Sequence, residues 1–287
     1  MNNINIEKKQ TKHGLLNFLS SDMYIGKSLK AYGEYSEIEL SIIMSFINEN
    51  DVVFDIGSNI GAFSIPFAKK VGNRGKVFCF EPQNLIYELL KKNVQDNKFT
   101  NVKLYQNGIG EKKSTIDLNL IDYSVMDNFG GISLVQTEKN PFFPGKEDPK
   151  QKIQIKMLDD FLSLKKCNLL KIDVESMEID VLNGGKKFIK KFRPIMWIEN
   201  QRIFPNSLNK FILNLDYNIY WVLSYLYNPN NHFRTQLNFF PNICTENILA
   251  IPKEKDDFIQ TKNFDQVINE KTPPKKIFWT TKISKTN

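Results

Sequence analysis

The chain has 287 residues, a formal net charge of +7 and 41% hydrophobic residues, which suits one large α/β domain with extra segments or two small domains. It has no apolar run near the roughly 18 residues that span a bilayer, no apolar signal-peptide stretch at its start and no nucleic-acid-binding motif. Three cysteines lie far apart without a metal-binding pattern, and they fit reduced thiols in a cytoplasmic protein.

Residues 1–50 are assigned to an N-terminal lead-in followed by a helix. The helix should begin at Ser36, because Ser36 and Glu39 have the spacing of a capping box and apolar residues follow at helical intervals. The preceding residues 32–35 could fold over a ligand, which would make Glu34 a cofactor-binding residue. They could also simply staple the start of the helix.

The stretch 52–56 is apolar apart from one acid, which predicts a buried parallel strand. A glycine-containing turn follows it. Glycine lets the backbone approach a ligand without a Cβ in the way, and the amides that open the next helix would face a negatively charged group. The strand and turn supply the candidate cofactor-binding residues Asp55, Gly57, Ser58, Asn59 and Gly61.

The next helix contains Pro66, so it either begins late, with Pro66 in its first turn, or is kinked. A second strand at 77–81 again ends in an acid, and Glu81 is placed to hold ribose hydroxyls. A helix to about residue 96 and a strand at 102–106 complete a β-α-β-α-β order, which is half of a doubly wound sheet. Further cofactor-binding candidates at these strand ends are Pro82, Asn107 and Gly108.

Residues 120–150 break this order as an irregular insertion, of the kind that often forms lids or binding loops. Polar and apolar residues alternate over 152–157, which predicts a strand with one solvent-exposed face. A short helix is expected to begin at Leu158. We then expect strands at 195–200, 217–221 and 246–251, a helix at 206–215, and an aromatic, Asn-rich loop at 224–245. The basic tail 253–287 could contact an anionic partner or membrane surface, or could be a solvated tail.

Three acids collect where a predicted buried strand, which runs from Leu169 and ends at Asp173, meets a helix that begins near Ser176. In an open α/β sheet this junction lies at the carboxyl edge, where ligands bind. Acids in the first turn of a helix are ordinary partners of the helix dipole. That explains Glu178 but not Asp173 at the end of a buried strand. We therefore expect Asp173 and Glu175 to act in the site and Glu178 to matter less.

Six motifs occur in order along the chain: Asp55-Ile56-Gly57-Ser58-Asn59-Ile60-Gly61, Phe80-Glu81-Pro82, Leu158-Asp159, Lys171-Ile172-Asp173-Val174-Glu175, Val181-Leu182-Asn183-Gly184-Gly185 and Arg193-Pro194 through Glu199-Asn200. In this order and spacing the chain resembles the FkbM family of S-adenosylmethionine (SAM)-dependent methyltransferases over roughly residues 30–252. It departs from the family at Ser176, where glycine is usual, and at Ser58, where alanine is frequent. Both residues are small, so we expect tuning of the site rather than loss of its function.

The resemblance implies a class I, Rossmann-like fold: a doubly wound, mostly parallel seven-stranded sheet with one antiparallel edge strand, for which 246–251 is the candidate. It places a SAM-dependent methyltransferase domain at 51–252. It also implies O-methylation of a hydroxyl on a sugar, a polysaccharide precursor or a secondary metabolite. The acceptor is thus expected to be a small molecule or saccharide and not a nucleic acid.

A hydroxyl acceptor must lose a proton, and a base contributes ~10²–10⁴-fold to such a reaction. Asp173 and Glu175 are the first catalytic candidates, with Glu199 and His232 behind them, and Asp173 is also a cofactor-binding candidate. Asp173, Glu199 and Asn200 could hold Mg²⁺ through oxygen ligands, but the sequence does not require a metal, and no metal ligand is assigned.

Two alternatives remain open at this point. A nicotinamide-dependent oxidoreductase would favour a glycine where Asn59 stands in the turn. A non-catalytic SAM-binding or scaffold protein of the same fold would be consistent with the departure at Ser176.

Overall fold

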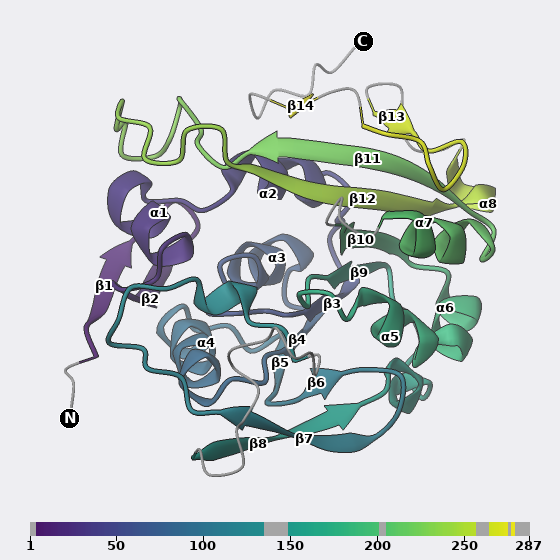
Figure 1. Cartoon of the computed structure of the whole chain (residues 1–287), viewed down its shortest axis with the longest axis horizontal. Coiled ribbons are helices and arrows are strands. Elements are labelled where there is room, and N and C mark those ends of the chain that lie inside the picture. The colour runs from purple at the N-terminus through teal and green to yellow at the C-terminus, as the bar shows by residue number, and fades with distance from the viewer. Residues whose placement is uncertain (1–3, 135–148, 201–204, 257–263, 275–276, 279–287) are drawn as a thin grey trace.

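A twisted sheet organises the computed structural model, which describes residues 4–134, 149–200, 205–256, 264–274 and 277–278. The strand order is β13-β11-β12-β10-β9-β3-β4-β5, with β14 beside β11 (Figure 1). Two strands of this sheet are only two residues long: β13 (Asp265–Gln266) and β14 (Ile277–Phe278). The seven main strands are β3 (Val52–Ile56), β4 (Lys76–Phe80), β5 (Val102–Tyr105), β9 (Leu169–Ile172), β10 (Ile195–Glu199), β11 (Tyr217–Tyr225) and β12 (Cys244–Pro252).

Helices cover both faces of this sheet, and each face has its own apolar core. Side chains of α2 (Glu37–Met44), α3 (Ser64–Val71) and α4 (Asn84–Asp96) pack into one core. Those of α5 (Glu178–Asn183), α6 (Lys186–Phe192) and α7 (Pro205–Leu213) pack into the other. The result is the three-layer arrangement expected of a doubly wound α/β fold.

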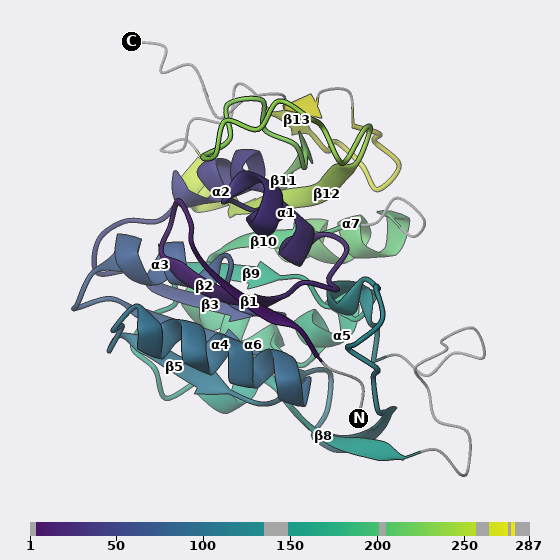
Figure 2. The ribbon, with the colours of Figure 1, turned by 90° about the vertical axis from the view of Figure 1, so that its left-hand side faces the viewer.

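Smaller elements surround these layers. A hairpin of β1 (Ile6–Gln10) and β2 (Leu15–Leu19) precedes α1 (Ile25–Tyr32), and Figure 2 shows it beside α4. Asn93 of α4 ties the hairpin down, because its side chain accepts the N–H of Asn17 at 2.7 Å. A separate sheet has the order β6-β8-β7. Its strands and the remaining short elements are β6 (Gly108–Ile109), β7 (Ser114–Asn119), β8 (Lys150–Lys156), η1 (Phe129–Gly131), η2 (Leu158–Phe161) and α8 (Lys253–Asp256).

The structure confirms the alternation of strands and helices that the sequence predicts. Pro66 is the third residue of α3, so that helix begins late and is not interrupted. The predicted strand at 152–157 exists as β8, but it belongs to the small sheet beside β7. Residues 135–148 of the predicted insertion at 120–150 and parts of the basic tail lie outside the described residues.

Two local predictions are wrong. Strand β12 is antiparallel to its neighbours as expected, but it lies between β10 and β11, inside the edge of the sheet. Its run 248–251 is fully buried, which is typical of an interior strand. The capping box at Ser36 does not form, because Ser36 has left-handed backbone and its Oγ donates to the carboxylate of Glu39 at 2.8 Å.

The loop that joins β11 to β12 folds back over α1, at the upper left of Figure 1. Tyr32 of α1 lies in the middle of an aromatic cluster, with ring centroids of Tyr227, Phe239 and Phe240 between 5.3 and 6.1 Å away. The aromatic residues of 224–245 therefore join this loop to the N-terminal segment. Among the described residues, none of the helices has the length and apolarity to cross a membrane.

Candidate active site

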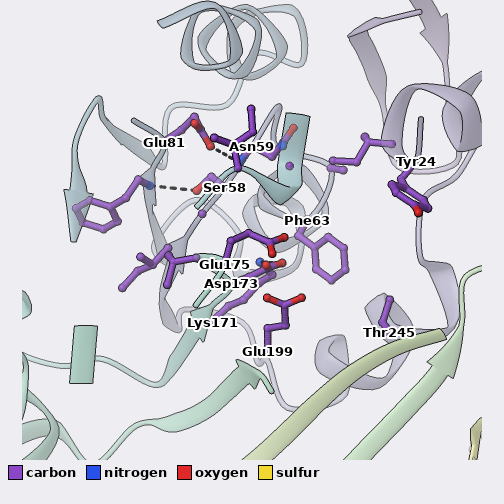
Figure 3. A pocket seen from close by; sticks show the side chains of 18 of the residues that line it. Tyr24, Ser58, Asn59, Phe63, Glu81, Lys171, Asp173, Glu175, Glu199 and Thr245 are labelled. Atoms are coloured by element: carbon purple, nitrogen blue, oxygen red, sulfur yellow. Dashed lines mark hydrogen bonds and ion pairs between the residues drawn. The ribbon is translucent and has the colours of Figure 1, made fainter. Parts of the chain in front are cut away.

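A cavity of about 510 Å³ lies at the carboxyl edge of the sheet. Strands β3, β4, β9 and β10 run parallel and end there, and antiparallel β12 begins there. Figure 3 shows side chains from these strand ends converging on one space. The polar and charged residues that line it are Tyr24, Tyr35, Glu39, Ser58, Asn59, Glu81, Gln83, Asn107, Asn128, Lys171, Asp173, Glu175, Glu199, Thr245, Glu246 and Asn247.

The turn after β3 packs directly against the strand end of β9. Gly57 has φ of +80°, and a Cβ at this position would lie 1.8 Å from the carbonyl oxygen of Asp173. Only glycine fits this close backbone approach without movement. Ser58 fixes the other side of the turn, because its Oγ donates to the Asp55 carbonyl at 2.6 Å and accepts the Phe80 N–H at 3.1 Å. The turn thus holds the ends of β3, β4 and β9 in fixed positions relative to one another.

Glu81 follows β4 and is almost fully buried, with 4% of its surface exposed. One carboxylate oxygen accepts the N–H of Asn59 at 3.0 Å, as Figure 3 shows. The other accepts the N–H of Gln83 at 2.9 Å. Burial raises the pKa of Glu81 to about 7, against the lowering effect of these two amides. A carboxylate oxygen has a second lone pair, so both oxygens can still accept a hydroxyl from a ligand in the cavity.

Gln83 anchors the insertion to this part of the site. Its side-chain amide donates to the Phe129 carbonyl at 2.9 Å and accepts the hydroxyl of Tyr123 at 3.0 Å. The segment that contains Phe129 also contributes Asn128, Gly130, Ile132 and Leu134 to the cavity wall. The described start of the insertion is therefore a wall of the cavity.

Lys171 projects from β9 and lies under the acidic end of the cavity. Its ammonium is 3.4 Å from Asp55 and 3.2 Å from Asp173, and it lies 5.3 Å from the centre of the Phe63 ring. Burial would lower the pKa of this lysine, but the carboxylates of Asp173, Asp55 and Glu39 outweigh it and raise that pKa above its ordinary range. Lys171 therefore remains a cation that holds these acids in place.

Two buried acids are neighbours of this lysine: Asp55 lies beneath the cavity floor, and Glu39 belongs to the lining. Asp55 accepts the Ser64 hydroxyl at 2.5 Å. Glu39 of α2 accepts the indole N–H of Trp197 at 3.1 Å. Burial raises the pKa of both carboxyls, and Lys171 opposes this shift.

Three further carboxylates converge in the cavity, as Figure 3 shows. Asp173 follows β9, Glu175 lies two residues beyond it, and Glu199 ends β10. One oxygen from each lies within 4.8 Å of the others. Such a group can take up a proton, orient a hydroxyl, or offer oxygen ligands to a hard cation.

A sequence profile for the methyltransferase FkbM domain matches residues 55–219 of the chain. The chain belongs to the FkbM methyltransferase family. Among curated relatives, methyltransferase sdnD of Sordaria araneosa is 29% identical over 190 residues, which cover 56% of this chain and 71% of that protein. The 2-O-methyltransferase NoeI of Sinorhizobium fredii is 26% identical over 159 residues, which cover 53% of this chain and 64% of NoeI.

Solved structures are more distant from this FkbM methyltransferase. The Methylobacillus flagellatus FkbM methyltransferase has a TM-score of 0.47 and 16% identity, over 71% of this chain and 44% of that one. A SAM-dependent O-methyltransferase from Thermotoga maritima has a TM-score of 0.49 and 15% identity, over 86% and 77% of the two chains.

The structure brings most of the predicted site residues of this FkbM methyltransferase together. Those that line the cavity are Gly57, Ser58, Asn59, Glu81, Pro82, Asn107, Gly108, Asp173, Glu175 and Glu199. Asp55 lies beneath the floor, and a Cβ on Gly61 would face Leu90. The Asn200 side chain turns away and donates to Asn209 at 2.9 Å.

Glu34 and His232 lie outside the cavity lining. The Glu34 carboxylate accepts the side-chain amide of Asn228 at 2.7 Å and the backbone N–H of His232 at 2.9 Å. Glu34 therefore holds the loop between β11 and β12 in the described structure.

Several lining residues were missed from the sequence. Lys171 belongs to the motif 171–175 of the family resemblance, and a lysine in an otherwise apolar strand is a signal for a site residue. Tyr24, Glu39 and Gln83 give no such signal, because they reach the cavity from segments that only the fold brings together.

Proposed function

We propose that this FkbM methyltransferase uses SAM to methylate a hydroxyl of an uncharged or cationic acceptor, such as a saccharide. One observation carries the proposal. A buried acid at the end of β4 and a cluster of three carboxylates face the same cavity, on either side of the glycine turn. The buried acid at the end of β4 suits the ribose hydroxyls of a nucleoside. The cluster of three carboxylates suits removal of a proton from the acceptor hydroxyl.

The residues present fit SAM. Glu81 and the backbone around Asn59 and Gly108 would hold its nucleoside part, because a buried carboxylate with free lone pairs suits paired ribose hydroxyls. The carboxylates near Asp173 offer a favourable potential for a sulfonium cation. When bound, SAM supplies an activated methyl group.

The chain's own residues would orient and deprotonate the acceptor. Asp173, Glu175 and Glu199 are close enough to bind one hydroxyl jointly, and one of them would accept its proton. Lys171 fixes the carboxylate of Asp173 at 3.2 Å and is itself buried, so it would hold that group in position through the reaction. Correct positioning of the acceptor oxygen is worth up to ~7–11 kcal/mol.

The charge of the lining supports the class of acceptor. Among the described residues that line the cavity, Lys171 is the one cation, and its ammonium is engaged with Asp55 and Asp173. Glu246 at the start of β12 adds another acid on the side away from Glu81. A phosphate or carboxylate on the acceptor would be repelled here, whereas hydroxyl or amino groups would find acceptors.

Two measurements test this function. Calorimetry should detect SAM binding to the wild-type chain, and Glu81→Ala should weaken it about ten- to a hundredfold, as loss of bonds to a charged group predicts. The exposed Glu88→Ala on α4 is the matched control and should bind as the wild type does. Transfer of a radioactive methyl group from SAM should then favour methyl glycosides and amino sugars over sugar phosphates. Absence of SAM binding, or a preference for sugar phosphates, would contradict the proposal.

A further inference from the structure

Glu178 is the first residue of α5, and it is 9% exposed, unlike the surface acids that ordinarily accompany a helix dipole. One of its carboxylate oxygens accepts the N–H groups of both Val174 and Ser176, each at 3.3 Å. The carboxylate thus fills a concavity of backbone amides, of the type that binds anions. The expectation that Glu178 is an ordinary dipole partner does not describe this arrangement.

The turn that Glu178 binds has an unusual backbone. Glu175 has φ of 52° and Ser176 has φ of 80°, so two consecutive residues with side chains adopt left-handed conformations. Such residues keep this conformation only where the surroundings hold them. The near end of the turn is held by the Asp173 N–H, which donates to the Ile56 carbonyl at 3.0 Å. Glu178 holds the far end.

We propose that Glu178 is a positioning residue that fixes the turn 174–176 and so directs Glu175 into the cluster with Asp173 and Glu199. Glu178 does not line the cavity, so it acts through the turn and not on a ligand. The importance of this role for turnover rests on the proposed methyltransferase function. That Glu178 fixes the backbone of the turn rests on the hydrogen bonds alone.

The first test compares Glu178→Ala and Glu178→Gln with Asp180→Ala. Asp180 lies in the same helical turn, and the described structure contains no hydrogen bond from its side chain to the turn 174–176, so it is the matched control. Glu178→Ala should speed hydrogen exchange of the amides at 174–176 and lower turnover about tenfold or more, with SAM affinity nearly unchanged. Glu178→Gln keeps a carbonyl acceptor of the same reach and should retain most of the turnover.

The second test uses glycine to relieve the backbone. Ser176→Gly should have little effect alone, but it should restore turnover to Glu178→Ala, because glycine adopts positive φ without a steric cost. A general loss of stability would lower the melting temperature of Glu178→Ala and would not respond to this glycine.

Unchanged exchange at 174–176 and unchanged turnover in Glu178→Ala would overturn the proposal, and so would an equal effect of Asp180→Ala. If the wild-type chain fails to bind SAM, the proposed function falls. The exchange measurement still decides whether Glu178 holds the turn.

Discussion

Glu81 shows how one residue connects burial to the pH dependence of binding. Its pKa in the folded chain is about 7, above the usual 4.5. Between these values the folded state therefore retains a proton that the unfolded state has lost. The contribution of Glu81 to the free energy of unfolding of the ligand-free chain falls as pH rises from about 4.5 to 7.

Binding of SAM should show the opposite trend. Ribose hydroxyls donate most strongly to an ionised carboxylate, so affinity should rise by up to about tenfold per pH unit below pH 7 and level off above it. Calorimetry from pH 5.5 to 8.5 measures this profile. Glu81→Gln should bind more weakly at high pH and give a flat profile. A rise of the same slope in Glu81→Gln would assign the titration to another group.

Gly57 is required for a tertiary contact that its sequence motif does not predict. The motif correctly predicts a glycine turn at the ligand edge, and it suggests that glycine is needed to approach the cofactor. The structure adds that the missing Cβ makes room for the carbonyl of Asp173, which directly follows β9 and lies more than 110 positions later in the sequence. This constraint could not be predicted, because it arises from the pairing of β3 with β9.

Substitution of Gly57 should therefore displace the acidic strand end as well as the glycine turn. Gly57→Ala should weaken SAM binding and also lower turnover, because the backbone at Asp173 must move to admit a methyl group. Gly130→Ala, also in the cavity wall, is the milder comparison, since a Cβ there would meet only two side-chain tips, Asn59 Nδ2 at 3.3 Å and Asn128 Oδ1 at 3.6 Å. Binding and turnover like the wild type in Gly57→Ala would show that the turn adapts.

At the scale of whole elements, periodicity and strand-end acids predicted most of the sheet and the edge that holds the cavity. Strand β12 was misplaced at the edge, because pairing order is not encoded in any single strand. Its continuous apolar run 248–251 was nonetheless a usable sign of an interior position. The β1-β2 hairpin was missed, because β1 carries lysines and a glutamate and neither strand shows a clear alternation of apolar and polar residues.

The acidic strand ends of β9 and β10 give a direct prediction about turnover. Asp173→Asn, Glu175→Gln and Glu199→Gln should each stay folded and bind SAM. At least one of them should lose the ~10²–10⁴-fold that a base contributes. Each amide keeps the shape of its carboxylate, so turnover with a methyl glycoside or an amino sugar reports the lost charge. Wild-type turnover in all three variants would place the base outside this cluster.

At the scale of the whole molecule, the N-terminal segment and the loop between β11 and β12 pack against each other and both contribute to the cavity lining, and Glu34 joins them. The Glu34 carboxylate is 4% exposed, accepts bonds from Asn228 and His232, and lies 3.7 Å from the ammonium of Lys12. Burial raises its pKa, against the lowering effect of the Asn228 bond. Sequence reasoning assigned Glu34 to the cofactor, whereas these contacts support a structural role.

The two roles of Glu34 predict different results for Glu34→Ala. A structural role leaves the buried side-chain amide of Asn228 and the part-buried N–H of His232 without their acceptor. This loss should cost roughly 1–3 kcal/mol of unfolding free energy and about 2–4 °C in melting temperature per kcal/mol. SAM affinity should then stay within a few-fold of the wild type. Glu7→Ala, which removes an exposed pair with Lys30, is the control and should change little. A large loss of SAM affinity with an unchanged melting temperature would instead place Glu34 at the cofactor.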